Sequence, residues 1–529
     1  MEEVKIRELP EKENVQITDY VIVEDDDGTK KTLIRHFRSL VLNTLYFNNI
    51  DELKNDLSRG LKDGDICQTL GYYEPGDGGG ALYQIKYDPA AVEDNMLIHY
   101  LSYSDTLRAE IILDNTINVN QFGAKGDGKH DDSSAIQCAL NNAWKKTIEF
   151  THGKKYLTKT QLNIINDGII INGHGAILYP QYVTGLSIAA ESDTANDVHD
   201  IYINNLNIDG SNATNSIYIN KASNIHIYKS IITCSEGKGG IVLKNSNFIN
   251  IENCEFDSDR GSSIVLEGDK NACVRSLNIH SCKFSSFSKA IHILSTGIAS
   301  PSNNITVSIE GCTFDSDIIN STSIYVACLI EYMDIKNNII TRCTKFLYYS
   351  SASGGNIYCN GLSCSAITTL FDFEAANGTL HLDGNIRKSS TTNTVTTLFN
   401  KLNGKLHSNI LWDKLSNMTI EINTSNVPSG ELIDITNPVH YGKSGYGISG
   451  SQLTLRSCHN VNIDWNSSTN NLESIVGGIK GQMIYITSST GKYIVGKEKK
   501  IILPNQSTQL GTYGIVLQYD GLQWVQIYI

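Results

Sequence analysis

The chain has 529 residues, 40% hydrophobic and 19% charged, and its 43 basic and 56 acidic side chains give a formal net charge of -13. We find no basic patch and no apolar run of the ~18 residues that a membrane helix needs, so nucleic-acid binding and membrane insertion are not expected. The first residues are charged and lack the apolar core of a signal peptide. We therefore expect the 12 cysteines to be reduced thiols.

Residues 1–45 are predicted to form a small N-terminal module. Tyr20-Val-Ile-Val-Glu and Lys31-Thr-Leu-Ile flank Asp25-Asp-Asp-Gly-Thr, and Asp-Gly between apolar runs is typical of a β-hairpin. A two-stranded hairpin is only marginally stable by itself. We expect this module to dock on a partner or on sister chains.

Residues 46–115 are predicted to form a second module of mixed α and β structure. A short amphipathic helix begins at Ile50, and strands are expected at residues 65–71 and 81–87. Between the strands lies Tyr72-Tyr-Glu-Pro-Gly-Asp-Gly-Gly-Gly, a run that could cradle a phosphate. The Gly-Lys-Ser/Thr ending of a phosphate-binding loop is absent, so a structural turn is favoured over a nucleotide site.

The third region, residues 116–440, opens with a glycine-rich segment that ends in Asp131, Asp132 and Ser133. These residue types cap the N-terminus of a helix. The helix behind them is predicted to cover the open end of a solenoid and to bury Ala135, Ile136, Ala139 and Leu140. A metal or acid cluster of Asp127, Asp131 and Asp132 is the alternative. We favour the turn and cap, and we expect no metal or other cofactor.

A repeat of 24 to 30 residues follows, in which apolar residues alternate. Its aligned sixth positions are Ser230, Cys254, Cys282, Cys312 and Asn338, with Leu206 before them and Asn385 and Asn409 after them. A period of this length indicates a solenoid. The alternation slips once per unit, at Asn205, Asn253, Ser281, Gly311, Asn337, Gly384 and Ser408. Asn and Gly enter the left-handed region most easily, so each unit is predicted to be one coil of a parallel β-helix with these corners and an inner ladder.

The glycine-rich segment Asn118-Val-Asn-Gln-Phe-Gly-Ala-Lys-Gly-Asp-Gly-Lys-His-Asp-Asp-Ser-Ser-Ala-Ile-Gln resembles the start of pectate-lyase-like right-handed β-helices. Leu61-Lys-Asp-Gly-Asp and the following Gly71-Tyr-Tyr-Glu-Pro-Gly-Asp-Gly-Gly-Gly are similar to the segment before the β-helix in bacteriophage tailspikes. The likeness covers roughly residues 46–440. It implies an all-β, right-handed parallel β-helix in a homotrimer on a virion.

Residues 441–529 break the repeat and are predicted to form an antiparallel, sandwich-like β module. Asp520-Gly is a hairpin signal. Gly478-Ile-Lys-Gly-Gln and Tyr519-Asp-Gly-Leu-Gln-Trp resemble the C-terminal modules of phage tail fibres. Trimerisation is the favoured role. Carbohydrate binding by Trp465 or Trp524 is a weaker alternative, since buried core tryptophans are more common.

Chemistry is predicted where carboxylates gather outside the coils. A glycoside hydrolase needs two carboxyl groups on one surface. Alternate residues of a strand share a face, so Asp257 and Asp259 are expected to project together, as are Asp315 and Asp317 two coils on, about 10 Å away. Ordinary turns are the competing interpretation. The predicted catalytic residues are Asp257, Asp259, Asp315, Asp317 and Glu236, and the predicted substrate-binding residues are Arg260, Tyr348 and Tyr349.

The resemblance implies a phage tailspike that binds and depolymerises host surface polysaccharide, either capsule or cell-wall glycan. Its N-terminal module would attach to the phage tail or baseplate, so the protein would belong to the virion after assembly in the host cytoplasm. A hydrolase is favoured over a lyase because no lyase-specific pattern is found. A glycan-binding tail adhesin of the same fold, without enzymatic activity, is the alternative.

Overall fold

The computed structural model describes residues 20–25, 28–33, 44–190, 197–268, 274–295, 305–350, 354–374, 377–388, 395–402 and 405–411, and after these only the short segments of strands β37 to β47 and residues 522 and 523. The chain divides into two compact units, Met1–Ala124 and Lys125–Ile529. Each unit is described by itself. Within the described residues no helix has the length and hydropathy needed to cross a membrane.

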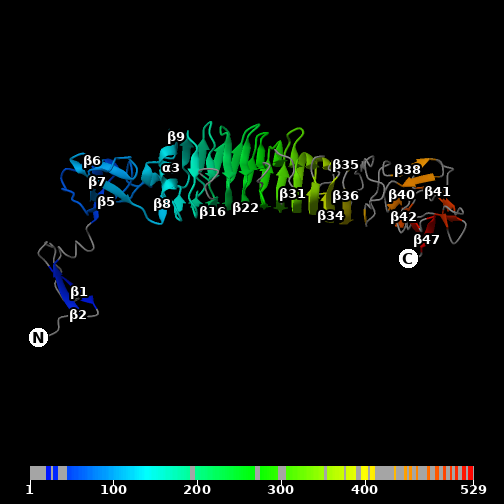
Figure 1. The fold of residues 1–529 in the computed structure, drawn as a ribbon, viewed down its shortest axis with the longest axis horizontal. Coiled ribbons are helices and arrows are strands. Elements are labelled where there is room, and N and C mark those ends of the chain that lie inside the picture. Colours follow the sequence, from blue (N-terminus) through cyan, green and yellow to red (C-terminus); the bar gives the residue numbers. More distant parts are fainter. Residues whose placement is uncertain are drawn as a thin grey trace. The chain divides into compact units, whose positions relative to one another are not determined.

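The first unit begins with a two-stranded hairpin. β1 (Tyr20–Asp25) and β2 (Gly28–Leu33) pair antiparallel, with Asp25 opposite Gly28 (Figure 1). This register confirms the hairpin that Asp-Gly between two apolar runs predicts. The partner that the sequence led us to expect for it stays a prediction.

A five-stranded sheet follows in the order β3-β4-β5-β7-β6. Its elements are β3 (Thr44–Phe47), α2 (Ile50–Asn55), β4 (Ile66–Thr69), β5 (Leu82–Tyr87), β6 (Ile98–Leu101) and β7 (Ser104–Ile112). The predicted helix and both predicted strands are present, whereas the hairpin of β6 and β7 was not predicted. Tyr83 and Ile85 of β5 are fully buried in the core of this sheet. The unit ends with β8 (Thr116–Asn118) and a 3-10 turn, η2 (Val119–Phe122).

The glycine run between β4 and β5 is a structural turn. The Asp77 carboxylate accepts hydrogen bonds from the backbone N–H groups of Tyr72, Tyr73, Glu74 and Gly79. A Cβ atom at Gly79 would lie 2.5 Å from the Asn120 carbonyl oxygen, so only glycine fits there. The run thus wraps around a carboxylate of its own, as the turn interpretation predicts.

The second unit is dominated by a parallel β-helix (Figure 1). Along most of the β-helix, each strand pairs with the third strand after it, so the coils have three faces. Nearly every strand pairs in parallel with the equivalent strand of the coil before and the coil after. The first face holds β10 (Thr147–Glu149), β13 (Ile170–Asn172), β16 (Val198–Asn204), β19 (Ala222–Tyr228), β22 (Asn247–Glu252), β25 (Ser276–His280) and β28 (Thr306–Glu310).

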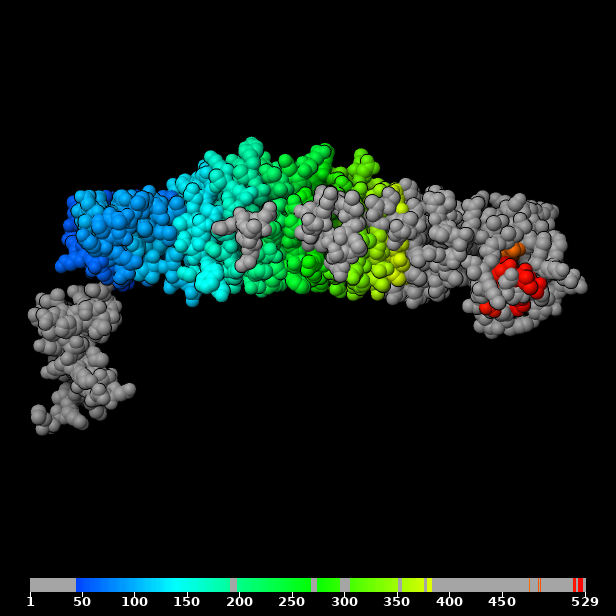
Figure 2. Space-filling model, viewed as in Figure 1, coloured from blue at the N-terminus to red at the C-terminus, as the bar shows by residue number. Residues whose placement is uncertain are grey.

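The second face holds β9 (Asp127–Asp131), β11 (Lys155–Thr158), β14 (Ile177–Pro180), β17 (Asn207–Gly210), β20 (Ile231–Cys234), β23 (Glu255–Asp257), β26 (Lys283–Ser285) and β29 (Thr313–Asp315). The third face holds β12 (Leu162–Ile164), β15 (Leu186–Ala189), β18 (Asn215–Asn220), β21 (Gly239–Lys244), β24 (Ser262–Gly268), β27 (Lys289–Ser295) and β30 (Thr322–Val326). In Figure 2 the colours of this part change steadily along the surface because successive coils stack in chain order.

Later strands run through the corners. They are β31 (Leu329–Tyr349), β32 (Gly354–Cys364), β33 (Ile367–Phe373), β34 (Asn377–Lys388), β35 (Val395–Leu402), β36 (Lys405–Leu411) and β37 (Asp434–Ile435). β31 pairs with β28, then β29, then β30, so one continuous strand supplies all three faces. The predicted parallel β-helix is confirmed.

The corners between the first and second faces adopt the predicted left-handed conformation. Their φ values lie between 49° and 65° at Asn205, Asn253, Ser281, Gly311 and Asn337. The side chains at Asn385, Ser408 and Asn409 lie outside the described part of the chain. A residue in this conformation redirects the strand in a single step, which produces the slip in the sequence alternation.

The inside of the coils is laddered as predicted. Cys254, Cys282 and Cys312 are buried free thiols on successive rungs. The rings of Phe256, Phe284 and Phe314, two positions further on, stack with centroids 5.0 Å apart at each step. Asn338 ends the cysteine series: its side chain accepts from the Cys312 backbone N–H at 2.8 Å and donates to the Ile309 carbonyl at 3.0 Å. Identical side chains thus stack without loss of packing or of hydrogen bonds.

Helix α3 (Ser133–Asn141) buries Ala135, Ile136, Ala139 and Leu140, the four residues that the sequence predicted. In the remaining strands of the unit, β38 (Tyr446–Ser449) pairs antiparallel with β39 (Gln452–Leu455), and β46 (Ile515–Tyr519) lies antiparallel between β42 (Met483–Thr487) and β47 (Trp524–Ile527). These pairings confirm a C-terminal antiparallel sheet. Three short strands pair in parallel with these: β40 (Asn460–Asn462) with β42, β41 (Ser474–Val476) with β39, and β44 (Ile501–Ile502) with β47. A separate antiparallel pair is formed by β43 (Tyr493–Val495) and β45 (Ser507–Gln509).

Candidate functional site

Polar side chains on the outside of the second face form one column in register. Asp257 pairs with Thr233 before it and Ser285 after it, and Ser285 pairs with Asp315. The register continues back to Asp209 and forward to Arg342. We call this series the acidic column: Asp209, Thr233, Asp257, Ser285, Asp315 and Arg342. Asp257 and Asp315 are two rungs apart, about 10 Å, which agrees with the spacing expected from the sequence.

The two ends of the acidic column are ion-paired. Lys155 Nζ lies 2.9 Å from Asp209, and the Arg342 guanidinium contacts both oxygens of Asp315, at 2.6 and 3.1 Å. The Arg342 hydrogen bonds outweigh partial burial and lower the pKa of Asp315. Asp315 is therefore held as an anion, which suits a base or a nucleophile better than an acid.

The middle of the column is open. Asp257 is exposed, and no described residue forms a hydrogen bond or an ion pair with its carboxylate. Ser285 stands between Asp257 and Asp315 and donates to the Phe256 carbonyl at 2.9 Å. Along the column, Asp257 therefore lies between two hydroxyl residues, Thr233 and Ser285. The ion-paired carboxylates of Asp209 and Asp315 lie beyond them.

The other predicted acids lie in turns, not on strands. β23 ends at Asp257 and β29 ends at Asp315, so Asp259 and Asp317 fall beyond the strand ends. The expectation that they project beside Asp257 and Asp315 by strand alternation was wrong, because the chain has already turned: φ is 28° at Asp259. Asp259 and Asp317 are nonetheless exposed.

Glu236 and Arg260 occupy equivalent turns. Glu236 follows β20, Arg260 follows β23, and their side chains approach to 3.9 Å while both remain exposed. An exposed pair at that separation contributes little stability. Glu236, Asp259, Arg260 and Asp317 all lie in turns that connect the second face to the third. The turns therefore add charge along the edge that the acidic column borders.

The two predicted tyrosines point in opposite directions. Tyr348 is half-buried on the outside of the third face. Tyr349 is 0% exposed, stacks on Phe373 and donates its hydroxyl to the Gly354 carbonyl. The prediction that Tyr349 binds substrate is wrong, because its ring belongs to the interior. Trp524 is likewise buried, at 1% exposure, which removes it as a sugar-binding residue, and Trp465 lies outside the described residues.

Sequence reasoning missed Asp209 and Arg342. The signal was present, since Asp209, Asp257, Ser285 and Asp315 each lie three residues after a ladder position. Arg342 lies four residues after Asn338, because the register shifts between Phe314 and Asp315. That irregularity has no counterpart in the sequence repeat.

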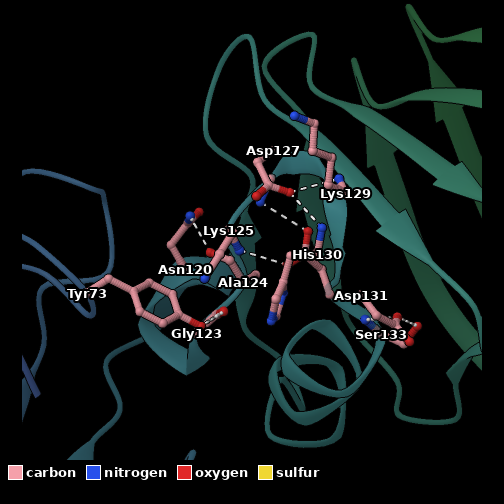
Figure 3. Close-up of polar contacts among 12 residues, drawn as sticks. Tyr73, Asn120, Gly123, Ala124, Lys125, Asp127, Lys129, His130, Asp131 and Ser133 are labelled. Carbon is pink, nitrogen blue, oxygen red and sulfur yellow. Dashed lines mark hydrogen bonds and ion pairs between the residues drawn. The ribbon is translucent and has the colours of Figure 1, made fainter. Parts of the chain in front are cut away.

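The acids of the glycine-rich segment are structural. The Asp127 carboxylate accepts from the backbone N–H groups of Lys129 and His130, at 2.8 and 2.7 Å (Figure 3). These hydrogen bonds lower the pKa of Asp127. Asp131 accepts from the Ser133 backbone N–H at 3.2 Å. The carboxylates of Asp127 and Asp131 thus each close a turn of the backbone, as the turn interpretation predicts.

Asp132 is 0% exposed and binds back into the loop instead of capping α3. It accepts from the N–H groups of Lys125 and Gly126 at 2.8 and 3.0 Å, and it lies 2.9 Å from His130 Nδ1. No group of three or more His, Cys, Asp or Glu side chains able to hold a metal ion occurs among the described residues.

Residues 116–348 match the family described as rhamnogalacturonase A/epimerase, pectate lyase-like. This stretch is a pectate-lyase-like domain. The acidic column from Asp209 to Arg342 lies wholly within it. The resemblance that the glycine-rich segment carries is thereby confirmed.

Two curated relatives overlap the chain. Plasmin and fibronectin-binding protein A of Streptococcus pneumoniae is 29% identical over 189 residues, 32% of this chain and 25% of the relative. The capsule K30/K69-specific depolymerase of Klebsiella phage K64-1 is 26% identical over 171 residues, 28% of this chain and 22% of the relative. The matches therefore span about a quarter of the length of each relative.

The fold is shared with a solved phage protein. The gp42 tailspike of Acinetobacter phage vb_AbaP_AS12 superposes with a TM-score of 0.51 at 13% identity, covering 92% of this chain and 94% of the tailspike. At that identity the likeness concerns the fold alone. The pectate-lyase-like domain is thus a parallel β-helix of a kind that also occurs in phage tailspikes.

Proposed function

We propose that the protein is a phage tailspike that binds host surface polysaccharide and depolymerises it. The observation that carries the proposal is the acidic column, which aligns Asp257 and Asp315 on the flank of a pectate-lyase-like β-helix. The local similarity to a capsule-specific phage depolymerase supports the same activity.

Hydrolysis is the reaction that the acidic column fits best. Asp315, kept anionic by Arg342, would activate water, and Asp257 would be the second carboxyl group, on the side of the leaving oxygen. Their separation of about 10 Å lies just above the range of about 6.5 to 9.5 Å for inverting enzymes and well above that for retaining ones. Glu236, Asp259 and Asp317 supply further carboxylates along the same edge.

The test is incubation of the full chain with purified capsular polysaccharides. New reducing ends indicate hydrolysis, whereas new near-ultraviolet absorbance indicates elimination. Asp257→Asn and Asp315→Asn should each lower turnover by about 100-fold or more. Asp209→Asn is the matched control, because it removes a carboxylate from the same column but outside the pair. Failure to shorten any capsular polysaccharide would refute the proposal.

A non-enzymatic adhesin is the second candidate. It is favoured by the similarity to plasmin and fibronectin-binding protein A. An adhesin would retain a host polysaccharide on the same flank without producing new ends. Tight binding combined with unchanged polymer length after long incubation selects this function over the first.

Assembly on the virion is part of the same proposal. The protein would form a homotrimer, attach to the phage tail or baseplate through the N-terminal hairpin module, and assemble in the host cytoplasm. Light scattering should then give three times the 58.3 kDa chain mass. Deleting residues 1–45 should leave the trimer and its glycan binding intact but abolish incorporation into phage particles.

A further inference from the structure

The outside of the third face carries aromatic side chains in register. His292 of β27, Tyr325 of β30 and Tyr348 of β31 occupy one position on three successive rungs. The His292 and Tyr325 ring centroids are 4.9 Å apart at 86°, and those of Tyr325 and Tyr348 are 4.7 Å apart at 31°. All three side chains are half-buried, so part of each ring reaches the surface. We call these three residues the aromatic row.

Two lysines flank the aromatic row. Lys289 and Lys345 lie on either side of Thr322 in the neighbouring column. Lys289 Nζ is 5.0 Å from the Tyr325 ring centroid, and Lys345 Nζ is 4.8 Å from that of Tyr348. Each ammonium group therefore lies against an aromatic ring, an arrangement that is mildly stabilising.

The two lysines differ in their ionic partners. Lys345 pairs with the carboxylate of Asp372, which is 1% exposed. For Lys289, no carboxylate of the described residues lies within ion-pair distance. In a chain with a net charge of -13, this leaves a positive charge without an anion beside an accessible aromatic surface.

His292 keeps the aromatic row uncharged at neutral pH. Burial, together with the positive charge of Lys289, lowers the pKa of His292 to about 4. The imidazole is therefore neutral where the protein would meet a host cell. The row presents aromatic rings beside the Lys289 ammonium, and at its far end the Glu374 carboxylate accepts a hydrogen bond from the Tyr348 hydroxyl at 3.3 Å. The rings beside Lys289 are suited to a ligand with both an apolar ring face and an acidic group.

Lys289 and Thr322 border the same turns as the acidic column, and the aromatic row lies three residues further along the third face. Ser285 ends β26 and Lys289 begins β27, so only residues 286–288 separate the two columns in this coil. In the next coil, residues 316–321 separate Asp315 from Thr322. A polymer lying along this edge would contact carboxylates on one side and Lys289 with Tyr325 on the other.

We infer that Lys289 and the aromatic row form a subsite for a carboxylate-bearing sugar of the polysaccharide. The inference rests on the proposed function and deepens it, since it selects acidic over neutral glycans. The exposed edges of the Tyr325 and Tyr348 rings would contact the apolar face of a pyranose, and its carboxylate would pair with the Lys289 ammonium. Rungs about 4.8 Å apart repeat at close to the length of one sugar unit in an extended chain.

The test uses a panel of purified acidic and neutral capsular polysaccharides from Klebsiella and Acinetobacter. Each acidic polymer is offered to the full chain both in native form and after chemical reduction of its carboxyl groups to alcohols. Binding is measured by biolayer interferometry in the cold. The tightest ligand should be acidic, and carboxyl reduction should weaken its binding about tenfold or more.

The variants separate charge from stacking. Lys289→Met should weaken binding of the native polymer about tenfold and leave binding of the reduced polymer unchanged. Tyr325→Leu should weaken both forms by the same factor. Lys229→Met removes an exposed lysine at a corner after the first face and is the matched control, expected to change neither. Melting curves should show that all three variants remain folded.

Three outcomes would overturn the subsite. They are tightest binding to a neutral polysaccharide, no effect of Lys289→Met, or an equal effect of Lys289→Met on native and reduced polymers. If the unmodified protein binds and shortens a polysaccharide but shows one of these outcomes, only the subsite fails. If it binds none of the panel, the proposed function fails and the subsite fails with it.

Discussion

The solenoid and the module of residues 44–112 differ in how they accommodate a buried polar side chain. Asn338 lies inside a coil and bonds to Cys312 and Ile309 of the preceding coil. His99 lies in the module at 1% exposure, and neither of its ring nitrogens meets a hydrogen-bond partner among the described residues. Asn338 thus finds backbone partners in the preceding coil and His99 finds none, although the coils also bury a hydroxyl that lacks a partner among the described residues, that of Thr158.

His99 is instead surrounded by aromatic rings. Tyr72 and Tyr83 pack against it edge-on, with centroids 6.3 and 5.7 Å away. Burial, with a smaller effect from the charge of Lys54, lowers its pKa from 6.5 to about 4. His99 is therefore buried as a neutral ring, and this burial lowers the stability of the fold only at a pH where the unfolded histidine would be protonated.

Acidification should therefore destabilise the module of residues 44–112, and this is the largest effect that we expect. Below pH 6.5 the unfolded module binds a proton that the folded module refuses until about pH 4, so the stability of the module falls through that window. The loss is roughly 3 kcal/mol at about 1.4 kcal/mol per pH unit. Hydrogen exchange resolved by peptide should show residues 44–112 losing protection as the pH falls from 6.5 to about 4.

His99→Phe provides the control for this prediction. The phenyl ring keeps the contacts with both tyrosines but cannot bind a proton. The difference between the pH profiles of the two proteins isolates His99 from every other titrating group. Identical profiles would mean that His99 does not cause the effect.

Removing the buried amide of the solenoid should have the next largest effect. Asn338→Ala leaves the Cys312 N–H and the Ile309 carbonyl without partners and should cost about 2 kcal/mol in urea unfolding. The control is Asn278→Ala, which removes an exposed amide that donates to Asn250 on the first face. A change within about 0.5 kcal/mol is expected there. Equal losses of unfolding free energy in the two variants would show that the buried amide stabilises the fold no more than the exposed one.

A corner substitution probes the solenoid more gently. Asn253 has a φ of 54°, so Asn253→Ala should cost about 1 kcal/mol, because alanine enters the left-handed region less readily. Asn253→Gly should cost less than Asn253→Ala, since glycine carries no Cβ. Thermal unfolding of both variants gives the order. The reverse order would contradict the backbone explanation.

The smallest change in stability is expected at Arg342. Its exposed ion pair with Asp315 is worth less than about 1 kcal/mol, but Arg342→Gln removes the group that lowers the pKa of Asp315. The carboxyl then keeps its proton to a higher pH, so the acid limb of the turnover profile should move upward. Arg260→Gln, which loses a contact of 3.9 Å to Glu236, should leave that limb in place.

The inner half of each coil was predictable from sequence because stacking demands the same residue type at each rung. The cysteine series, the Asn338 position and the left-handed corners all follow from one alignment. On the outside of the coils, stacking does not require the same residue type at each rung. Asp209, Thr233, Asp257, Ser285 and Asp315 share only their register, and the register shift that brings in Arg342 is a local backbone irregularity.

The orientation of Tyr348 and Tyr349 illustrates the remaining limit. Alternation fixes that neighbouring residues point in opposite directions, but it does not fix which of them points inward. β31 passes through two corners between Leu329 and Tyr349, and each corner can reverse the parity. The side chain that packs is then decided by three-dimensional neighbours, here Phe373, and not by the local pattern.

The turns between the second and third faces have one property with a wider consequence. They hold residues 211–214, 235–238, 258–261, 286–288 and 316–321, so their lengths differ from coil to coil while the strands on either side keep their register. Some turn residues are fixed by packing, since Phe287 and Ser258 are fully buried. The exposed positions, such as Glu236, Asp259 and Asp317, are free to vary, so the charge along this edge can change while the scaffold stays the same.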